Sequence, residues 1–157
     1  MVFNQSPMHE CLNKIRWGKV LLSALAYLVI FGILQRISLM LTANYYMMPE
    51  YSGVWNKMMM PTPGFPPLEF TITSLFYAFL SGFALATLFA FIKDSFEQDY
   101  FQRVSGYTII VILFVWIFTF LPMLMLFNLP FLLVMAWVIV SMLSIFLSAM
   151  VFAKLIK

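Results

Sequence analysis

Residues 43–69 read ANYYMMPEYSGVWNKMMMPTPGFPPLE, and this stretch divides the chain. It holds five of the eight prolines and five of the thirteen methionines, and a long apolar run lies on each side of it. Two prolines at 66 and 67 suit a helix entry, where the backbone N–H groups need no intrahelical partner. The stretch is therefore predicted to be a loop that connects two long helices.

The composition of the whole chain indicates which solvent surrounds those helices. Of its 157 residues, 64% are hydrophobic and only 10% are charged, whereas a typical soluble domain carries about 25% charged residues. A soluble chain this short could not bury so much apolar surface. The lipid bilayer is the expected partner. The basic residues are scattered singly rather than gathered on one face, which argues against nucleic acid as a partner.

Four apolar runs are each long enough to cross a bilayer, at about 20–43, 68–92, 104–127 and 131–156. The 24 residues of the first run would rise about 36 Å as a helix, which exceeds a hydrocarbon core of about 30 Å. We therefore predict an all-α membrane protein with a single domain. Its four transmembrane helices would form an up-down bundle with a structured outer loop between the first two.

The segments between the later runs are short. Residues 93–103, KDSFEQDYFQR, are predicted to be a charged loop, and Asn128, Leu129 and Pro130 a tight turn. Because Pro122 removes a helical hydrogen bond, we expect a kink near the end of the third helix.

Lysine and arginine are distributed unevenly over the two ends of the predicted helices. Four spans place both termini and the 93–103 loop on one side. Seven basic residues fall on that side: Lys14, Arg16, Lys19, Lys93, Arg103, Lys154 and Lys157. The other side has Lys57 alone. Because cytoplasmic segments carry an excess of Lys and Arg, both termini are predicted to be cytoplasmic and the 43–69 stretch to face outward.

Two of the predicted helices carry stripes of small or polar residues. The second helix repeats a small residue every four positions: Ser74, Ala78, Gly82, Ala86 and Ala90. This spacing lets a neighbouring helix approach closely within a membrane. The fourth helix has one face formed by Trp137, Ser141, Ser144 and Ser148. We interpret both stripes as packing seams, with a polar conduit as the alternative.

Arg36 is the charged residue that lies deepest in a predicted span. A charge at the bilayer centre costs about 2.5–3.5 kcal/mol, and such residues usually face the bundle or a wet cavity and have a partner. Glu69 and Glu50 are the candidate partners. The alternative is that the Arg36 side chain only extends to the outer headgroups. Its predicted face also carries Gly32, Gln35 and Thr42.

The sequence offers little for catalysis or for metal binding. It has one histidine and one cysteine, and we find no His–carboxylate pair, nucleophile motif or phosphate-binding glycine loop. Nine methionines lie in the predicted outer half or the outer loop, and thioethers are soft ligands that suit Cu(I). Methionine also fills irregular apolar gaps, and we adopt this interpretation. We therefore predict no enzyme, no metal site and no cofactor.

The 43–69 stretch is too apolar to be a free tether. Tyrosine and tryptophan favour the membrane interface, so residues 51–60 are predicted to form an interfacial helix or a cap over the mouth of the bundle. The pattern Tyr46-x-x-Pro49-x-Tyr51-x-Gly53-Val54-Trp55 resembles the outer-loop motif of some uncharacterised four-helix integral membrane proteins. The resemblance covers ten residues and implies architecture without a mechanism.

Two hypotheses about function follow. In the first, the chain is a small non-catalytic polytopic membrane protein that acts through partner or self-association, as a homo-oligomer or a subunit of a membrane complex. In the second, it is an outward-facing binding or transport protein that recognises an anionic or amphipathic small molecule or lipid. The ligand-binding residues would then be Arg36, Gln35, Glu69, Trp55 and Tyr51.

Overall fold

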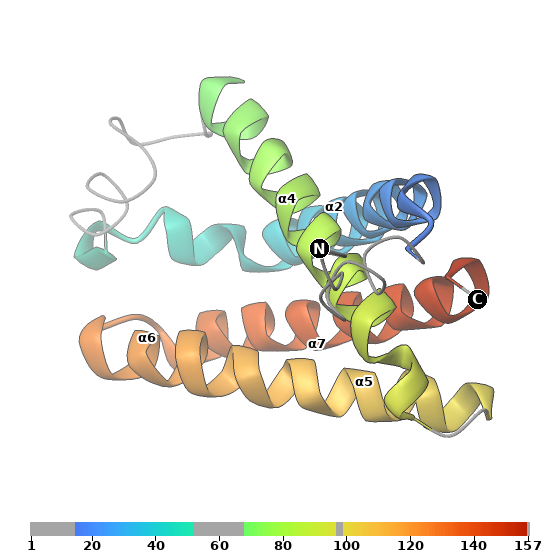
Figure 1. Cartoon of the computed structure of the whole chain (residues 1–157). Coiled ribbons are helices and arrows are strands. Elements are labelled where there is room, and N and C mark those ends of the chain that lie inside the picture. Colours follow the sequence, from blue (N-terminus) through green and yellow to red (C-terminus); the bar gives the residue numbers. More distant parts are fainter. Residues whose placement is uncertain (1–14, 52–67, 97–98, 157) are drawn as a thin grey trace, which may run out of the picture.

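The structure, a computed structural model, describes residues 15–51, 68–96 and 99–156, and no strand occurs among them. Four helices in this part of the chain are long and apolar enough to cross a membrane (Figure 1). They are α2 (Trp17–Tyr46), α4 (Leu68–Ile92), the continuous series α5 (Tyr100–Val115), η3 (Trp116–Phe120) and α6 (Leu121–Leu126), and α7 (Phe131–Leu155). The short turns η1 (Pro49–Tyr51) and η2 (Lys93–Ser95) follow α2 and α4. The predicted all-helical class with four apolar helices is confirmed.

The helix ends differ in places from those predicted. α2 extends three residues further at each end, whereas α4 begins and ends where predicted. α5 begins at Tyr100 rather than at residue 104, because Asp99 caps it. The Asp99 carboxylate accepts hydrogen bonds from the N–H groups of Phe101 and Gln102 at 3.0 and 3.2 Å, which satisfies donors that a helix start leaves free. The predicted charged loop at 93–103 was therefore too long.

The irregularity predicted at Pro122 takes the form of a wider helical turn. Proline has no N–H to donate, and its ring clashes with the carbonyl four residues earlier. In η3 the chain forms a π turn, in which the N–H of Leu121 bonds the carbonyl of Trp116, five residues back. One extra residue in the turn accommodates the proline, and the helix continues into α6.

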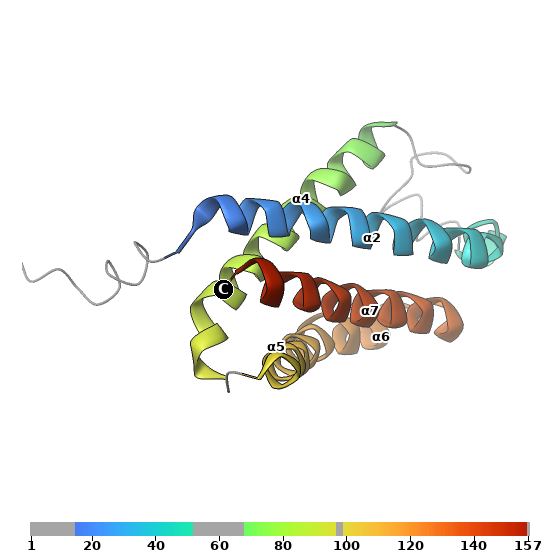
Figure 2. The same cartoon turned by 90° about the vertical axis from the view of Figure 1, so that its right-hand side faces the viewer.

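Three of the four long helices run side by side, and the other crosses them. Figures 1 and 2 show α2, α7 and the α5–α6 series lying next to one another in alternating directions, whereas α4 crosses α2 steeply. α2 packs against both α4 and α7, and α5 packs against α7. The half of α4 that begins at Leu68 extends away from the other helices (Figure 2).

The largest buried core is built from α4, α5 and α7, together with Val20 and Tyr27 of α2. The rings of Phe89, Tyr107 and Phe152 pack edge to face, with centroids 5.1 to 6.3 Å apart. Tyr107 is fully buried, and its hydroxyl donates a hydrogen bond of 2.7 Å to the carbonyl of Leu85 in α4. The Tyr100 hydroxyl donates a second bond, of 3.0 Å, to a carbonyl of α7. Aromatic packing and these two bonds hold the ends of the three helices together.

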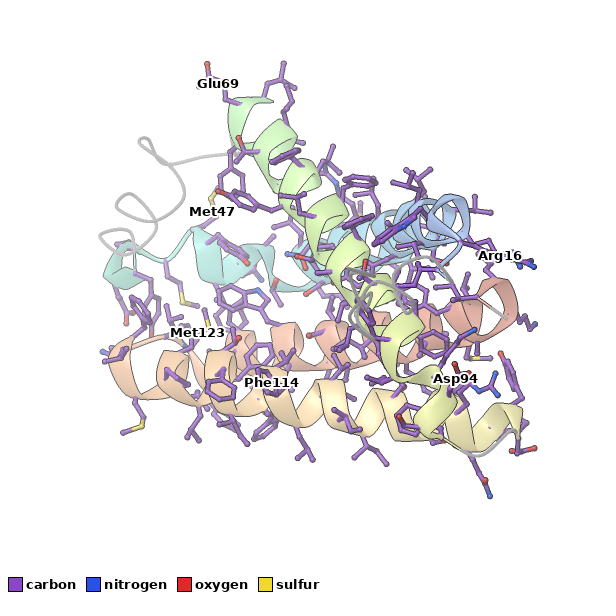
Figure 3. The ribbon with its side chains drawn as sticks, viewed as in Figure 1. Arg16, Met47, Glu69, Asp94, Phe114 and Met123 are labelled. Atoms are coloured by element: carbon purple, nitrogen blue, oxygen red, sulfur yellow. The ribbon has the colours of Figure 1, made fainter. Side chains whose placement is uncertain are left out.

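The two ends of the molecule differ in charge. Arg16 and Asp94 lie at one end, and Met47 and Met123 lie at the other (Figure 3). Apart from Arg36, the basic residues that the structure describes all belong to the first end: Arg16, Lys19, Lys93, Arg103 and Lys154. We call this the basic end, and the opposite end, where α2 ends and α7 begins, the far end.

Gly82 is the point at which α4 crosses α2. A Cβ atom built on Gly82 would lie 2.8 Å from Cδ1 of Tyr27, 2.9 Å from its Cβ, and 3.0 Å from the carbonyl oxygen of Ala24. The last of these is a backbone atom, so a change of rotamer cannot make room. The absent side chain thus permits the close helix contact that small residues provide in membranes.

Replacing Gly82 with a large residue should separate these helices. Gly82→Leu is expected to lower the free energy of unfolding by about 1–3 kcal/mol, because the added atoms meet the backbone of α2. The measurement is thermal unfolding in detergent, followed by circular dichroism. Gly32→Leu is the matched control, since a Cβ there has no atom within 4 Å. Equal losses for the two variants would contradict the crossing at Gly82.

Candidate functional site

The small-residue stripe of α4 shows how far α4 stays in contact with its neighbours. Ala78, Gly82, Ala86 and Ala90 are buried, whereas Ser74 is exposed. The stripe therefore packs against other helices from Ala78 to Ala90, towards the basic end. On the Leu68 side of Ala78, α4 extends away from them (Figure 2). An open wedge between α2 and α4 follows from this divergence.

An open groove of about 560 Å³ lies in this wedge. Seven of its lining residues come from α2 and one from α4: Leu28, Val29, Gly32, Ile33, Arg36, Ile37, Met40 and Leu75. Arg36 is the charged member of this set, and the rest are apolar or glycine. We refer to this surface as the α2–α4 groove.

Arg36 is exposed in the groove and has no acidic partner among the described residues. The sequence hypothesis placed Glu69 opposite it. Arg36 lies nine residues, about 14 Å, beyond the crossing along α2, and Glu69 lies thirteen residues, about 20 Å, from the crossing along the diverging α4. Figure 3 shows Glu69 at the tip of α4, pointing away from α2. The structure therefore does not bring Arg36 and Glu69 together.

The other predicted site residues lie in different places. Gln35 is half-buried on α2 and is not part of the groove lining. Tyr51, in η1, packs with Tyr45 against the fully buried Leu133 at the start of α7. Trp55 lies outside the described residues. Of the four predicted site residues that the structure describes, Arg36 is the one that lines the groove.

A hydrogen bond at the far end joins α2 to α7. The indole N–H of Trp137 donates to the hydroxyl of Tyr46 at 3.1 Å. Thr42, predicted to share the face of Arg36, is instead buried, and its hydroxyl donates to the Ser38 carbonyl at 2.7 Å. The polar face of α2 around Thr42 is therefore separate from the groove.

The serine face of α7 is partly buried between helices. Ser144 and Ser148 are buried, whereas Ser141 is half-buried. Ser144 donates to the carbonyl of Val140 at 2.7 Å, one helical turn earlier. The Ser148 hydroxyl has no hydrogen-bond partner among the described residues. The Ser144 hydroxyl, which bonds its own helix, needs no water, and at this position the packing seam is favoured over the polar conduit.

The described methionines of the far half lie in several different environments. Met123 and Met135 pack against the buried Phe120, Val134 and Val138. Met40 lines the α2–α4 groove, and Met125 is exposed at the end of α6. Residues 58–60 lie outside the described part of the chain. Within that part, no group of three or more His, Cys, Asp or Glu residues is placed to hold a metal ion.

The sequence interpretation missed most of the groove. The spacing of Leu28, Gly32, Arg36 and Met40 by four residues is the signal that could have found its α2 side. Leu75 could not be found in this way, because its place depends on the angle at which α4 crosses α2.

The structure describes four helices that are long and apolar enough to cross a membrane, which is consistent with a multi-pass membrane protein. Comparison with protein-family models, with curated proteins and with solved structures found no match for this chain. The resemblance of residues 46–55 to the outer-loop motif of four-helix membrane proteins is not tested by these comparisons and stays a prediction from the sequence. The α2–α4 groove with Arg36 is the feature of the described residues that bears on function.

Proposed function

We propose that the chain is an integral membrane protein whose four helices cross the bilayer in up-down order, with the basic end in the cytoplasm. Five basic residues at that end support this orientation, since cytoplasmic segments are enriched in Lys and Arg. The loop between α2 and α4 then faces outward. The α2–α4 groove lies in the outer half of the membrane.

Cysteine labelling tests this orientation. In a Cys11→Ser background, Asn128→Cys should react with a membrane-impermeant maleimide added to intact cells, because Asn128 is exposed at the far end. Ser95→Cys, exposed at the basic end, should react only after the cells are opened. The reverse pattern would contradict the proposed orientation.

Within this orientation, we propose that the protein is a non-catalytic binding protein for an amphipathic anion. The observation that carries the proposal is the exposed Arg36 in a groove otherwise lined by apolar side chains. In this orientation the groove opens towards the surrounding lipid rather than towards water, so a ligand would enter from the bilayer.

Electrostatics explains why the ligand should be anionic. A charged side chain is costly in hydrocarbon, and an opposite charge offsets that cost. The described residues provide no such partner for Arg36. A guanidinium also binds phosphate or carboxylate through two parallel hydrogen bonds. An anionic group with an apolar tail would satisfy both the cation and the apolar walls.

Association with a second membrane protein is the other candidate function. The observation that favours it is the exposed half of α4 nearest Leu68, which includes Ile72, Phe76 and Tyr77. A helix face that contacts only lipid also exposes apolar side chains, so this observation does not distinguish a protein interface from lipid contact. The free cation of the groove is the more specific feature, so we place ligand binding first.

Thermal stability in the presence of an amphiphile tests the binding function. Dodecyl phosphate, added to the protein in a non-ionic detergent, should raise the thermal midpoint, because ligand that binds the folded state stabilises it by about 2.7 kcal/mol at one hundred times Kd. Arg36→Gln should abolish the increase. Lys19→Gln, at the basic end, should leave it intact.

A cationic amphiphile with the same chain is the matched control ligand and should give no increase. An equal response of the wild type and Arg36→Gln to dodecyl phosphate would refute the binding function. A thermal midpoint that does not change with dodecyl phosphate but rises with protein concentration would favour association with a second protein instead.

A further inference from the structure

The shape of the α2–α4 groove specifies the class of its ligand. Resting on the function proposed above, we infer that the ligand is an anionic phospholipid of the outer leaflet. Its phosphate binds Arg36, and one of its acyl chains lies along α2 over Gly32 towards Leu28. Three features support this assignment: the length of the groove, the open space at Gly32 and the absence of an acidic residue from the groove lining.

The groove has the length of one leaflet. It follows α2 from Leu28 to Met40, a rise of about 18 Å over twelve residues. Half of a hydrocarbon core of about 30 Å is about 15 Å. Twenty residues counted from Val20, which follows Lys19, reach the outer boundary of that core near Met40. The groove thus runs from the outer boundary to just beyond the middle of the bilayer.

Gly32 keeps the middle of this path open. A Cβ built on Gly32 has no atom within 4 Å, unlike one built on Gly82. No protein contact therefore requires glycine at position 32. The walls beside it, from Leu28 and Ile33 to Leu75 on α4, are apolar. An extended acyl chain is the component of the membrane that fits an open apolar path of this length.

Arg36 lies where a phospholipid phosphate can reach it. It is four residues, about 6 Å, below Met40, and arginine side chains extend towards the headgroup layer. The planar guanidinium matches the geometry of a phosphate group. The phosphate and the acyl chain can therefore be bound at the same time by neighbouring turns of α2.

The charges around Arg36 favour a headgroup with a net negative charge. A zwitterionic headgroup also carries an ammonium, which needs an acidic residue or must stay beside the arginine. The groove lining has no acidic residue, and Glu69 points away at the tip of α4 (Figure 3). Phosphatidylglycerol should thus bind better than phosphatidylcholine with identical chains.

Lipid retention measured by native mass spectrometry tests this inference. The full-length protein is incubated in detergent with equal amounts of the two lipids. The wild type should retain phosphatidylglycerol about five-fold over phosphatidylcholine, since one basic residue near the surface contributes about that factor. Arg36→Gln should reduce the ratio to about one. Arg36→Lys should keep part of the preference.

A second variant tests the acyl-chain path separately. Gly32→Phe should fold with an unchanged thermal midpoint and yet lose most of both lipids, because the ring fills the groove. Gly18→Phe is the matched control, since a Cβ there also has no atom within 4 Å and position 18 lies at the basic end.

The outcomes separate this inference from the function on which it rests. Equal retention of the two lipids by the wild type, or full retention by Gly32→Phe, would overturn the phospholipid assignment. If dodecyl phosphate still stabilised the wild type but not Arg36→Gln, the binding function would stand without the phospholipid assignment. If Arg36→Gln changed neither the stabilisation by dodecyl phosphate nor the retention of phosphatidylglycerol, both the binding function and the phospholipid assignment would be refuted.

Discussion

The contact between Gly82 and the backbone of α2 is the constraint on which the rest of the structure depends. A Cβ at this position would lie 3.0 Å from the Ala24 carbonyl, so the two helices touch there with nothing between them. A close contact at one point allows α4 to cross α2 steeply rather than to lie along it. The buried half of α4 and its exposed half are both consequences of this crossing.

The packing that stabilises the molecule and the candidate site lie in different regions. The rings of Phe89, Tyr107 and Phe152 and the hydrogen bond to Leu85 belong to the basic half. At the far end, α2 is joined to α7 by the bond between Trp137 and Tyr46. The groove lies outside both regions. Its residues can therefore be changed without disturbing the packing that holds the helices together.

This separation also explains why a charge can persist in so apolar a chain. An arginine buried between packed helices would need a fixed acidic partner, because an unpaired buried charge is strongly destabilising. Arg36 instead lies in an open groove, which in the proposed orientation is within reach of the headgroup layer. Its partner can be a molecule from the membrane rather than a residue of the chain.

The sequence was sufficient for the helices and insufficient for the angles between them. Length and hydropathy located all four apolar runs, and the four-residue repeat identified the face of α4 that packs, except at the exposed Ser74. The Asp99 cap was missed because the charged residues around it resemble a loop. The predicted proximity of Arg36 and Glu69 assumed that α2 and α4 lie side by side along their whole length. No local pattern encodes a crossing angle, which depends on contacts between residues far apart in the chain.

The divergence of α2 and α4 is the central claim, and pulsed electron paramagnetic resonance measures it directly. One pair of spin labels at Leu25 and Leu80 would flank the crossing, and another at Met40 and Leu68 would mark the two free ends; all four positions are exposed. The divergence predicts that the second distance exceeds the first by at least about 10 Å, since each arm extends about 20 Å beyond the crossing. Similar distances for the two pairs would show that the helices lie side by side, and the groove would not exist.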